Sequence, residues 1–598
     1  MNDQPKIMDT VCAVIGSYLV KGEGDRFERQ GKAALSATLQ PFIDKGEPIE
    51  LVLPGFPFKS LNFHAKTSGP KPDFGEVLAL RRLEEMCAAI DAVYGHGVRL
   101  TIVSDGTTYN DVIGVSDEDR QAYNDAVRTL WPSRYFRWAT VTDLVGHPGT
   151  PQELRDALIE KAALPYADLN AFKRAVKADE ALGAAHDRMC SFLYNDLRPQ
   201  VADDLDEDAY FAEIREKAYE MMIRGLALNA GVERAFPQAV RLSVHQYDNA
   251  GPKFSIGLLA GLGHVSAPWH KVPYRHLDGH FSFVDHAWID AARTLAVYRG
   301  DQVWLYQESD AEIDPAVRMS IVKPPQFGLL VELDAPEKVK LLTPRLTRSL
   351  ADFFSFICVR GCHFEEREDL VDYCLPFGDI YQWHFGPVHV VQPEEKPKGF
   401  VQSLEKTPIH WDLSMLPLDH KRVKLDEWFC ADLFMLYCKT PPQKGEGETT
   451  LVDGREILRE AGPETVEAWR NTNITYNTKM TYFGGHPRKY TLVHTHPETG
   501  EPILRYQEGS KSEYQTFSQA VEGLSQSDSD AFVEAMNRRI YEPKVCYEHP
   551  WEAGDMVIVE NYLALHGRNP MSDASNKREL WRVQTIPDMP VANRSAAE

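Results

Sequence analysis

Hydrophobic and polar positions along the first part of the chain follow the order of a parallel α/β domain. Residues 1–50 mix the two classes at helical spacing. The apolar run ELVLPGFPFKS (50–60) predicts a buried strand that ends in a Pro/Gly loop. A helix is predicted over 78–97, where a glycine ends the pattern, and a second buried strand over 98–111. Strand, helix and strand in this order predict a parallel sheet, which binds ligands at the carboxyl ends of its strands.

The pattern changes in the second half of the chain. Residues 121–235 look mainly helical, and strand patterns return in VRLSVHQY and FSIGLLAG (240–261). The proline-containing segment 308–326 interrupts this order, and short strands with frequent Gly and Pro turns follow it. We therefore expect two domains: an α/β (Rossmann-like) domain over 1–325, and a double-stranded β-helix (jelly roll) with flanking helices over 326–598.

Composition limits the classes of function. A chain of 598 residues with 43% hydrophobic content is too long for one ordinary core. Its net charge of −23 argues against a nucleic-acid partner or an anionic membrane. The N-terminus lacks a signal-peptide pattern, and no stretch reaches the roughly 18 apolar residues of a membrane span. Nine cysteines without CxxC pairs indicate reduced thiols, so we expect a cytoplasmic protein. Whether it forms a homo-oligomer is open.

The segment TPIHWDLS (407–414) carries the first candidate chemistry. Its His410 and Asp412 are two residues apart on a predicted strand, so both side chains point to one face. Two histidines and one carboxylate hold Fe(II) and leave coordination positions open. A single HxD pair is weak evidence, and His276–Asp278 is another, which we interpret as structural because nothing downstream completes it. His566 completes the C-terminal pair.

Two other candidate metal sites are not favoured. Cys358, Cys362 and His363 lie close in sequence, but a second ligand pair at a zinc-site spacing is missing. His494 and His496 are followed at once by Pro-Glu-Thr-Gly, so we interpret them as hairpin residues.

The residues after His566 extend the iron motif. Arg578 and Arg582 follow it, and arginine suits bidentate binding of a carboxylate. This order resembles the taurine dioxygenase family of Fe(II)/2-oxoglutarate oxygenases. GEGETTLVD (445–453) resembles the family's Gly-Gly-Asp-Thr turn, with Glu at two of its positions, and THPETGEPILRY (495–506) resembles its hairpin. The resemblance implies iron binding by His410, Asp412 and His566, 2-oxoglutarate binding by Thr449 and Arg578, and cosubstrate or substrate binding by Arg582.

Polar loops after the N-terminal strands carry the second set of candidates. The motifs are PFKS (57–60), Ser-Asp-Gly (104–106), the strand and loop at 240–256, and Pro-Trp-His (268–270). Together they resemble the isocyanide synthase family, also called pyoverdine/dityrosine biosynthesis proteins. That resemblance implies an amino acid and ribulose 5-phosphate as substrates. The chemistry needs anion clamps and acid/base groups. The candidates are Lys59, Ser60, Arg241 and Lys253 for catalysis or anion binding, and Asp105, His245 and His270 for proton transfer.

The two resemblances together imply a bifunctional enzyme of secondary metabolism. It would make an isocyanide and then oxidise it with Fe(II), 2-oxoglutarate and O2, by oxidative decarboxylation to a vinyl isocyanide or by hydroxylation. One chain would pass the intermediate between sites at high effective concentration. Two alternatives are kept: a single-activity hydroxylase with a non-catalytic N-terminal scaffold, and an iron- or 2-oxoglutarate-responsive regulatory protein. The amino acid is not readable from the sequence.

Overall fold

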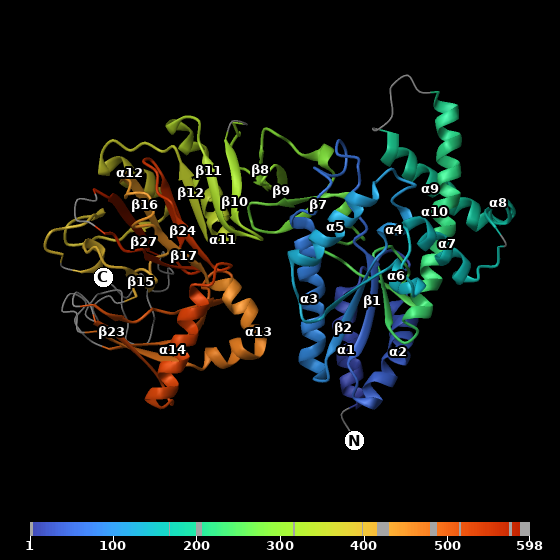
Figure 1. Cartoon of the computed structure of the whole chain (residues 1–598), viewed down its shortest axis with the longest axis horizontal. Coiled ribbons are helices and arrows are strands. Elements are labelled where there is room, and N and C mark those ends of the chain that lie inside the picture. Colours follow the sequence, from blue (N-terminus) through green and yellow to red (C-terminus); the bar gives the residue numbers. More distant parts are fainter. Residues whose placement is uncertain are drawn as a thin grey trace. The chain divides into compact units, whose positions relative to one another are not determined.

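The structure of the chain is a computed structural model (Figure 1). It describes residues 4–166, 168–198, 206–314, 317–397, 399–414, 430–478, 487–512, 516–572 and 577–586. The first three and last twelve residues, on which the interpretation of the termini depends in part, lie outside these ranges. The chain divides into two compact units, Met1–His276 with His280–Asp290 and Tyr298–Glu308, and Leu277–Gly279 with Ala291–Val297 and Ser309–Glu598. The boundary at 325/326 stays a prediction.

A five-stranded parallel sheet forms the centre of the first unit. Its strands are β1 (Ile49–Gly55), β2 (Val98–Ser104), β3 (Phe136–Thr140), β4 (Val240–Ser243) and β5 (Lys253–Ser255), in the order β3-β2-β1-β4-β5. Every neighbouring pair is parallel, as the hydrophobic pattern predicted. From β1 the chain adds β2 and β3 on one side of the sheet, and then β4 and β5 on the other side. Ligands of such sheets bind at the position between β1 and β4, where the direction of strand addition reverses. The loops after β1, β2 and β4 carry most of the N-terminal candidates.

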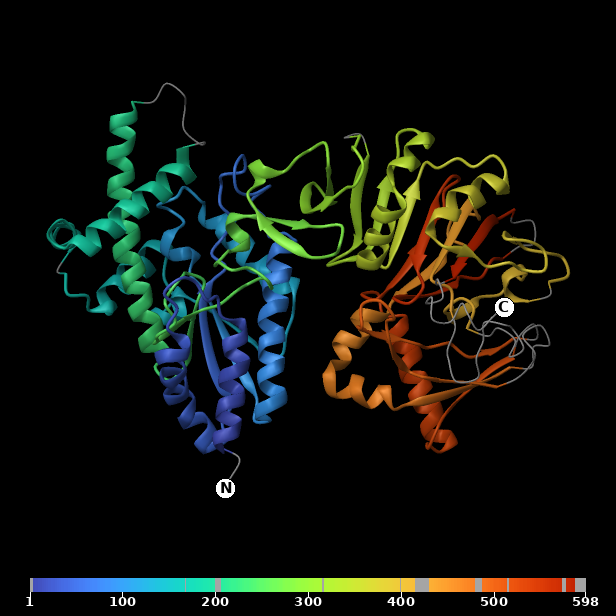
Figure 2. The ribbon, with the colours of Figure 1, turned by 180° about the vertical axis from the view of Figure 1, so that it is seen from behind.

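Helices cover both faces of this sheet. In Figures 1 and 2, which view the unit from opposite sides, the strands lie between α3 (Phe74–Tyr94) and α10 (Glu207–Ala235). Val52 and Val103 pack with residues of α6 (Val141–Val145), α7 (Pro151–Ala162) and α10. The remaining helices are α1 (Gln4–Tyr18), α2 (Lys32–Lys45), α4 (Gly106–Tyr109), α5 (Asp117–Leu130), α8 (Leu169–Ala178) and α9 (Glu180–Leu197).

Strands appear earlier after the parallel sheet than the sequence pattern suggested. In the first unit β6 (Val272–Arg275) pairs antiparallel with β7 (Phe281–Val284) and parallel with β9 (Gln302–Glu308). β8 (Thr294–Arg299) and β10 (Arg318–Lys323) also precede residue 326. These strands are short, and only β10 lies within the proline-containing segment 308–326 that interrupts the pattern.

The second unit is a jelly roll with added helices. One sheet runs β10, β11 (Phe327–Glu332), β12 (Phe356–Arg360), β25 (Met556–Glu560), β16 (Leu433–Thr440), β27 (Glu579–Ile586) and β13 (Asp379–Ile380), and β14 (His389–Val391) also pairs with β27. The other runs β15 (Thr407–His410), β26 (Ala564–Arg568), β17 (Thr449–Asp453) and β24 (Cys546–His549). Leu451 and Ala564 of the second sheet pack with Phe434 and Val557 of the first, so a shared core lies between the sheets.

A third sheet and four helices flank the jelly roll. The sheet is β19 (Arg488–Thr491), β18 (Asn473–Thr478), β23 (Thr516–Val521) and β22 (Ser510–Lys511), beside the hairpin β20 (Val493–Thr495) and β21 (Pro502–Leu504). The helices are α11 (Pro344–Phe354), α12 (Arg367–Cys374), α13 (Gly454–Arg470) and α14 (Gln526–Ile540). Residues of α13, α14 and the hairpin join Trp411 in one core, which supports the strand that carries the iron motif.

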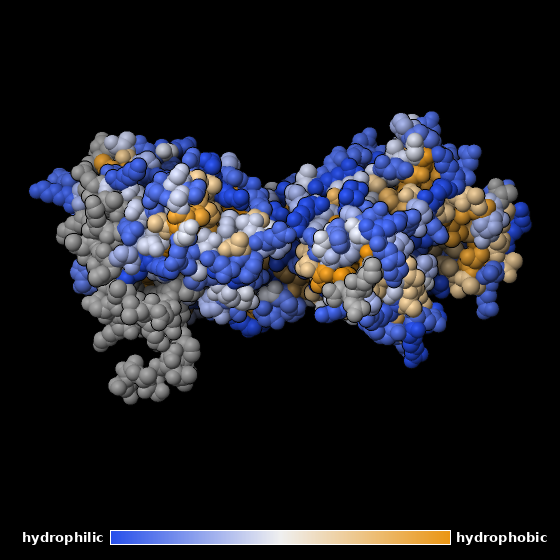
Figure 3. Space-filling model, turned by 90° about the horizontal axis from the view of Figure 1, so that it is seen from below, coloured by the Kyte–Doolittle hydropathy of each residue, from blue (hydrophilic) through white to orange (hydrophobic). Residues whose placement is uncertain are grey.

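The surface is mainly hydrophilic on the face that Figure 3 shows, with hydrophobic side chains in separate areas. Among the described residues, no helix combines the length and the apolar character that a membrane span needs.

Candidate functional site

Strand pairing brings the three predicted iron ligands together. β15 and β26 are antiparallel neighbours, and His410 lies opposite His566 in their register. Nε2 of each histidine lies close to Oδ1 of Asp412, at 3.6 Å for His410 and 3.5 Å for His566. One ligand atom from each residue falls within 4.8 Å of the others. Asp412 and His566 are buried, while the side chain of His410 is 28% exposed, so the cluster is open to solvent on one side.

The protonation states of these groups suit metal binding. Nδ1 of His410 lies 2.8 Å from the carbonyl oxygen of Pro408. A carbonyl only accepts, so Nδ1 carries the proton and Nε2 keeps its lone pair for a metal. Burial first, and then the neighbouring His410, lower the pKa of His566 to about 4, which keeps that ring neutral. Burial alone would raise the pKa of Asp412, but the Arg582 guanidinium holds it well below its usual value.

Asp412 is held in place by residues from the opposite sheet. Arg582 Nη1 donates to its Oδ1 at 3.2 Å, and Gln584 Nε2 donates to its Oδ2 at 2.6 Å. The side-chain oxygen of Asn561 accepts from the Asp412 backbone N–H at 3.0 Å. Arg582 therefore supports the metal-binding carboxylate directly. The sequence indicated neither Gln584 nor Asn561, because neither belongs to a ligand motif.

Close backbone approach also shapes this cluster. A Cβ on Gly567 would lie 2.7 Å from the carbonyl oxygen of Thr407, so only glycine lets β15 and β26 pair this tightly beside His566. Leu413, directly after Asp412, has a φ of 63°, a left-handed conformation that is strained for a branched side chain. Backbone strain of this kind concentrates at functional sites.

The predicted cosubstrate residues lie in the buried interior of the same unit. Thr449 begins β17 and lies opposite Arg568 of β26 in the register. Arg578 is 2% exposed, and burial followed by the neighbouring Arg568 lowers its pKa to about 9. Arg568 donates hydrogen bonds to carbonyl oxygens of Phe400, Val401, Ser403 and Glu405. The buried guanidinium groups of Arg568 and Arg578 act on each other and create a positive environment that a carboxylate ligand would stabilise.

A second cluster of ligand-type side chains lies elsewhere in the jelly roll. Cys358, His549 and Asp555 are buried with ligand atoms within 4.8 Å of one another. Asp555 already accepts from His549 Nε2 at 3.0 Å and from Arg360 Nε and Nη2 at 2.9 and 3.0 Å. A cation here would be repelled by the Arg360 guanidinium. Burial, as the largest cause, raises the pKa of the Cys358 thiol well above its usual value, so the thiol stays protonated. We interpret this cluster as a structural hydrogen-bond network.

The other histidine and cysteine candidates contact nearby residues of the fold. His276 stacks on His280 with ring centroids 3.8 Å apart and contacts the Ser282 hydroxyl at 3.0 Å. His496 Nδ1 accepts from the backbone N–H groups of Glu498 and Thr499 in the hairpin turn. The cluster of Cys358 with His363 does not form, since His363 is exposed beside Glu365.

In the first unit Lys59 is not available to bind an anionic substrate. Its ammonium contacts Asp73 Oδ2 at 2.7 Å, the Pro268 carbonyl at 2.9 Å and Glu76 Oε2 at 3.1 Å. All three donors are used, and the residue is 1% exposed. Asp73 caps the N-terminus of α3, so Lys59 ties the loop after β1 to this helix. The expectation that Lys59 meets a substrate phosphate is corrected on this ground: its role is structural.

Ser60 belongs to a different cluster, which includes two residues that the sequence did not indicate. Ser60 Oγ donates to Asp196 Oδ1 at 2.8 Å, and Lys66 Nζ pairs with the same oxygen at 2.7 Å. Asp196 is buried, whereas the Lys66 side chain is 20% exposed. The Lys66 ammonium lies 4.7 Å from the centre of the Phe192 ring, which packs edge-on against His270. Asp196 sits in a helical stretch without a motif, so only folding reveals it.

His270 is a partly buried imidazole whose Nδ1 atom is shielded from solvent. Its Nδ1 has no hydrogen-bond partner among the residues that the structure describes. Burial first, and then the Lys66 ammonium, lower its pKa to about 4, against the opposing effect of Asp196. The imidazole is therefore neutral near pH 7 and can accept a proton. Trp269 beside it is 4% exposed and packs on Phe56, which makes it a core residue.

Asp105 directly follows the neighbouring strand β2. Its Oδ1 is buried and has no hydrogen-bond partner among the described residues, and burial raises the pKa of its carboxyl to about 7. A Cβ on Gly106 would lie 2.4 Å from the Pro57 carbonyl oxygen, so glycine lets this loop touch the loop after β1. A carboxyl whose pKa lies near neutrality suits general acid/base chemistry.

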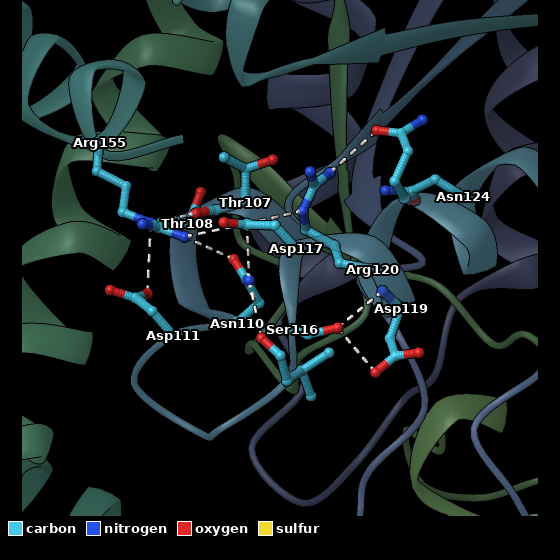
Figure 4. Close-up of polar contacts among 12 residues, drawn as sticks. Thr107, Thr108, Asn110, Asp111, Ser116, Asp117, Asp119, Arg120, Asn124 and Arg155 are labelled. Carbon is cyan, nitrogen blue, oxygen red and sulfur yellow. Dashed lines mark hydrogen bonds and ion pairs between the residues drawn. The ribbon is translucent and has the colours of Figure 1, made fainter. Parts of the chain in front are cut away.

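A network of polar contacts fixes the loop that carries Asp105 (Figure 4). Arg155 of α7 donates to the Thr107 carbonyl at 2.8 Å and to Asn110 Oδ1 at 2.9 Å, and pairs with Asp111 at 3.3 Å. Arg224 of α10 donates to Asp111 Oδ1 at 2.7 Å. Figure 4 shows Arg155 directed at both Asn110 and Asp111 from the adjoining helix. The arginines therefore position this loop.

The remaining N-terminal candidates lie in β4, directly after it and in β5. Arg241 of β4 donates to Glu233 and Asn229 of α10 at 3.1 and 2.6 Å, so its charge is used within the fold. Lys253 lies opposite it in the register, and burial followed by Arg241 lowers the pKa of Lys253 to about 8. His245 follows the end of β4 at an exposed position, where partial desolvation and Lys253 lower its pKa. Anion binding by Arg241 is disfavoured, because it already pairs with Glu233.

Comparison with known proteins identifies both units. The family model of pyoverdine/dityrosine biosynthesis proteins matches residues 39–297, and that of the taurine catabolism dioxygenase TauD, TfdA family matches 322–584. The L-tyrosine isonitrile synthase of Pseudomonas aeruginosa is 31% identical over 42% of this chain and 76% of its own length. The chain belongs to the isocyanide synthase family, joined to a TauD-type oxygenase.

Relatives with the second domain support this identification. Isocyanide synthase xanB of Aspergillus fumigatus is 27% identical over 97% of this chain and 81% of its own length. The tyrosine isonitrile desaturase of Pseudomonas aeruginosa is 27% identical over 45% of this chain and 92% of its own length. This synthase–oxygenase is a bifunctional enzyme whose second domain uses Fe(II), with 2-oxoglutarate and O2 as cosubstrates. The two histidines and one buried carboxylate fit the two-histidine, one-carboxylate ligand set that such iron sites use.

Proposed function

We propose that the enzyme converts an L-amino acid and ribulose 5-phosphate to an isocyanide acid in its first domain and oxidises that product in its second. C2 of the pentose phosphate would become the isocyanide carbon. The second step would remove a β-hydrogen and carbon dioxide to give a vinyl isocyanide, with hydroxylation as the alternative outcome. Both outcomes begin with removal of the same hydrogen, so the protein fold does not distinguish them.

The observation that carries this proposal is the His410–Asp412–His566 cluster within a chain whose other half matches isocyanide synthases. Iron held by these three residues would activate O2 with 2-oxoglutarate. Thr449 and Arg578 would bind the distal carboxylate of 2-oxoglutarate in the buried positive environment described above. Arg582 would keep Asp412 oriented and ionised, through the hydrogen bond of 3.2 Å that it donates.

In the first domain we assign the proton-transfer roles to His270 and Asp105. Each has a buried atom with no hydrogen-bond partner among the described residues, and each follows a strand or loop at the carboxyl edge of the parallel sheet. Lys66, held by Asp196 and partly exposed, takes the cationic role that Lys59 cannot fill. Ser60 orients Asp196, and His245 and Lys253 would lie at the margin of this site.

The strand order β3-β2-β1-β4-β5 is that of doubly wound sheets, which supports a Rossmann-like class for the first domain. We also propose that the synthase domain comprises residues 1–325 and the oxygenase domain residues 326–598. Amino acid and sugar phosphate are the proposed small-molecule partners, and association into a homo-oligomer stays a prediction.

Isotope labelling of the full chain tests the whole proposal. The enzyme is incubated with a pool of the twenty amino acids and ribulose 5-phosphate labelled at C2, with and without O2, and products are identified by mass spectrometry. Labelled saturated isocyanide acid should form without O2, and its oxidised product only with O2, Fe(II) and 2-oxoglutarate. Label from another carbon would refute the synthase reaction. Turnover of 2-oxoglutarate without any isocyanide would favour a hydroxylase with a non-catalytic first domain.

A further inference from the structure

A buried tryptophan contacts the threonine that is proposed to bind 2-oxoglutarate. Trp551 Nε1 donates a hydrogen bond to Thr449 Oγ1 at 3.1 Å. Trp551 is 7% exposed and Thr449 is 2% exposed, so water does not compete well for this bond. Trp551 follows β24, and Thr449 begins the neighbouring strand β17, where it lies opposite His549 in the register. The contact therefore joins two adjacent strands of the smaller jelly-roll sheet.

The direction of this hydrogen bond determines where the Thr449 proton points. An indole N–H can only donate, so the Thr449 oxygen must act as its acceptor. The single hydroxyl proton is then directed away from Trp551, and no described residue accepts it in a hydrogen bond. A hydroxyl fixed in this way is ready to donate to an anionic oxygen. Without Trp551 the hydroxyl would rotate among three staggered positions.

Trp551 is itself held by the Cys358–His549–Asp555 network. His549 packs edge-on against the Trp551 ring, with centroids 4.5 Å apart and an interplanar angle of 88°. His549 is bonded to Asp555 at 3.0 Å, and Asp555 also accepts from the backbone N–H of Glu552 at 3.0 Å, the residue after Trp551. This network fixes the short segment that carries the indole. The Cys358–His549–Asp555 cluster therefore has a structural role that does not require a metal.

We propose that Trp551 is a positioning residue for 2-oxoglutarate. It orients the Thr449 hydroxyl so that this hydroxyl donates a hydrogen bond to the distal carboxylate of the cosubstrate. This inference rests on the proposed role of Thr449. The expected effect is on cosubstrate affinity. Trp551 does not touch the iron ligands in any described contact, so iron binding and the chemistry at saturating 2-oxoglutarate should depend little on it.

A double-mutant cycle on the full chain tests the coupling. Trp551→Phe removes the donor and keeps an aromatic ring, Thr449→Val removes the acceptor and keeps the shape, and the third variant carries both changes. Trp469→Phe is the matched control, because Trp469 is also 7% exposed but lies in the core around α13 and α14. The dissociation constant of 2-oxoglutarate is measured by calorimetry without O2 on enzyme loaded with Fe(II), together with KM and kcat for 2-oxoglutarate.

Trp551→Phe should weaken 2-oxoglutarate binding about 3- to 10-fold, the effect of one neutral hydrogen bond. In Trp551→Phe, KM for 2-oxoglutarate should rise with little change in kcat, and the affinity for Fe(II) should equal that of the wild type. The control variant Trp469→Phe should equal the wild type in all of these measurements. The double variant should bind 2-oxoglutarate no more weakly than Thr449→Val alone. If the two effects multiply instead, or if Trp551→Phe binds normally, Trp551 does not act through Thr449.

Two results separate this inference from the proposed function. If Thr449→Val itself leaves the dissociation constant unchanged, the positioning role is wrong, while loss of oxidation in the iron-ligand variants would still support the oxygenase. If none of the iron-ligand variants affects oxidation, the proposed function fails first. Trp551→Met is the second variant if Trp551→Phe does not fold; it also lacks a donor and carries the same expectation.

Discussion

His410 of β15 and His566 of β26 lie directly opposite each other on antiparallel strands, with their ring centroids 4.3 Å apart. The pair is separated by more than 150 residues in sequence, yet one strand pairing sets its geometry. Asp412 follows His410 by two positions and completes the cluster from the same segment. Ligand geometry therefore depends on the register of two strands, and any slip by one residue would point one histidine away.

Removing any iron ligand should abolish oxidation and leave isocyanide formation intact. His410→Ala, Asp412→Ala and His566→Ala each leave two ligands, which cannot hold an open iron site. Product analysis by mass spectrometry should then show the saturated isocyanide acid accumulating. His494→Ala is the control, because His494 bonds to Thr491 in the hairpin, and it should keep both activities. Wild-type consumption of 2-oxoglutarate coupled to product in the ligand variants would overturn the assignment.

Arg578 should set the affinity for 2-oxoglutarate. Loss of a charge-assisted bidentate pair costs on the order of 2–4 kcal/mol, or roughly 30- to 1000-fold in binding. Arg578→Lys should also bind poorly, since an ammonium cannot reproduce the planar fork. A 2-oxoglutarate titration of Arg578→Ala and Arg578→Lys measures this. An unchanged requirement in Arg578→Ala would move the carboxylate clamp to Arg582, whose known contacts are with Asp412 and His389.

The iron cluster was predicted from an ordered motif, His410 and Asp412 followed by His566 and the arginines. The strand alternation expected for the first pair is not what places it, because β15 ends at His410 and Asp412 lies in the turn that follows. The parallel sheet was predicted from β1 and β2, which are mainly apolar and almost wholly buried, with a helix between them. Cosubstrate or substrate binding by Arg582 stays a prediction, and its hydrogen bond to Asp412 is evident only in the folded chain.

The synthase site could be predicted only in part, because a sequence motif does not show which side chains are buried or which form ion pairs. Lys59 looked like an exposed loop cation, yet Asp73 and Glu76 of the following helix consume its charge. Lys66 and Asp196 are separated by 130 residues and meet through tertiary packing, so neither carried a signal. Trp551 was invisible for the same reason: its significance lies in one hydrogen bond to Thr449.

Lys59→Met should destabilise the first domain without a specific effect on pentose phosphate binding. The change leaves Asp73 and Glu76 buried without their cation, and breaking such a buried pair costs about 3–5 kcal/mol. Urea denaturation of the full chain should show an earlier transition. Lys71→Met is the matched control, because Lys71 pairs with Asp301 at 3.5 Å on the exposed surface and should be nearly neutral. A stable Lys59→Met enzyme with a raised ribulose 5-phosphate requirement would restore the anion-binding role.

Asp105 should make both stability and isocyanide formation depend on pH near neutrality. Burial raises the pKa of its carboxyl to about 7 in the folded chain, from an ordinary value of 3.8. The folded state therefore binds more protons than the unfolded state between these values. Its contribution to stability is fully present below the unfolded pKa and is lost as pH rises through about 7. Asp105→Asn removes this dependence, so the variant should gain stability relative to the wild type as pH rises.

Denaturation at several values between about pH 5 and pH 8 measures the difference between Asp105→Asn and wild type. Asp248→Asn is the control, because the pKa of Asp248 shifts in the opposite direction: the hydrogen bond from Arg26 lowers it. Asp248 is therefore ionised in both states across this range, and the stability difference between Asp248→Asn and wild type should not change with pH. As a proton acceptor, Asp105 must be ionised, so the rate of isocyanide formation should rise with pH around 7 in the wild type. Asp105→Asn should lose that activity while oxidation of added isocyanide acid continues. An Asp105→Asn enzyme that makes isocyanide at the wild-type rate would leave His270 as the remaining candidate base.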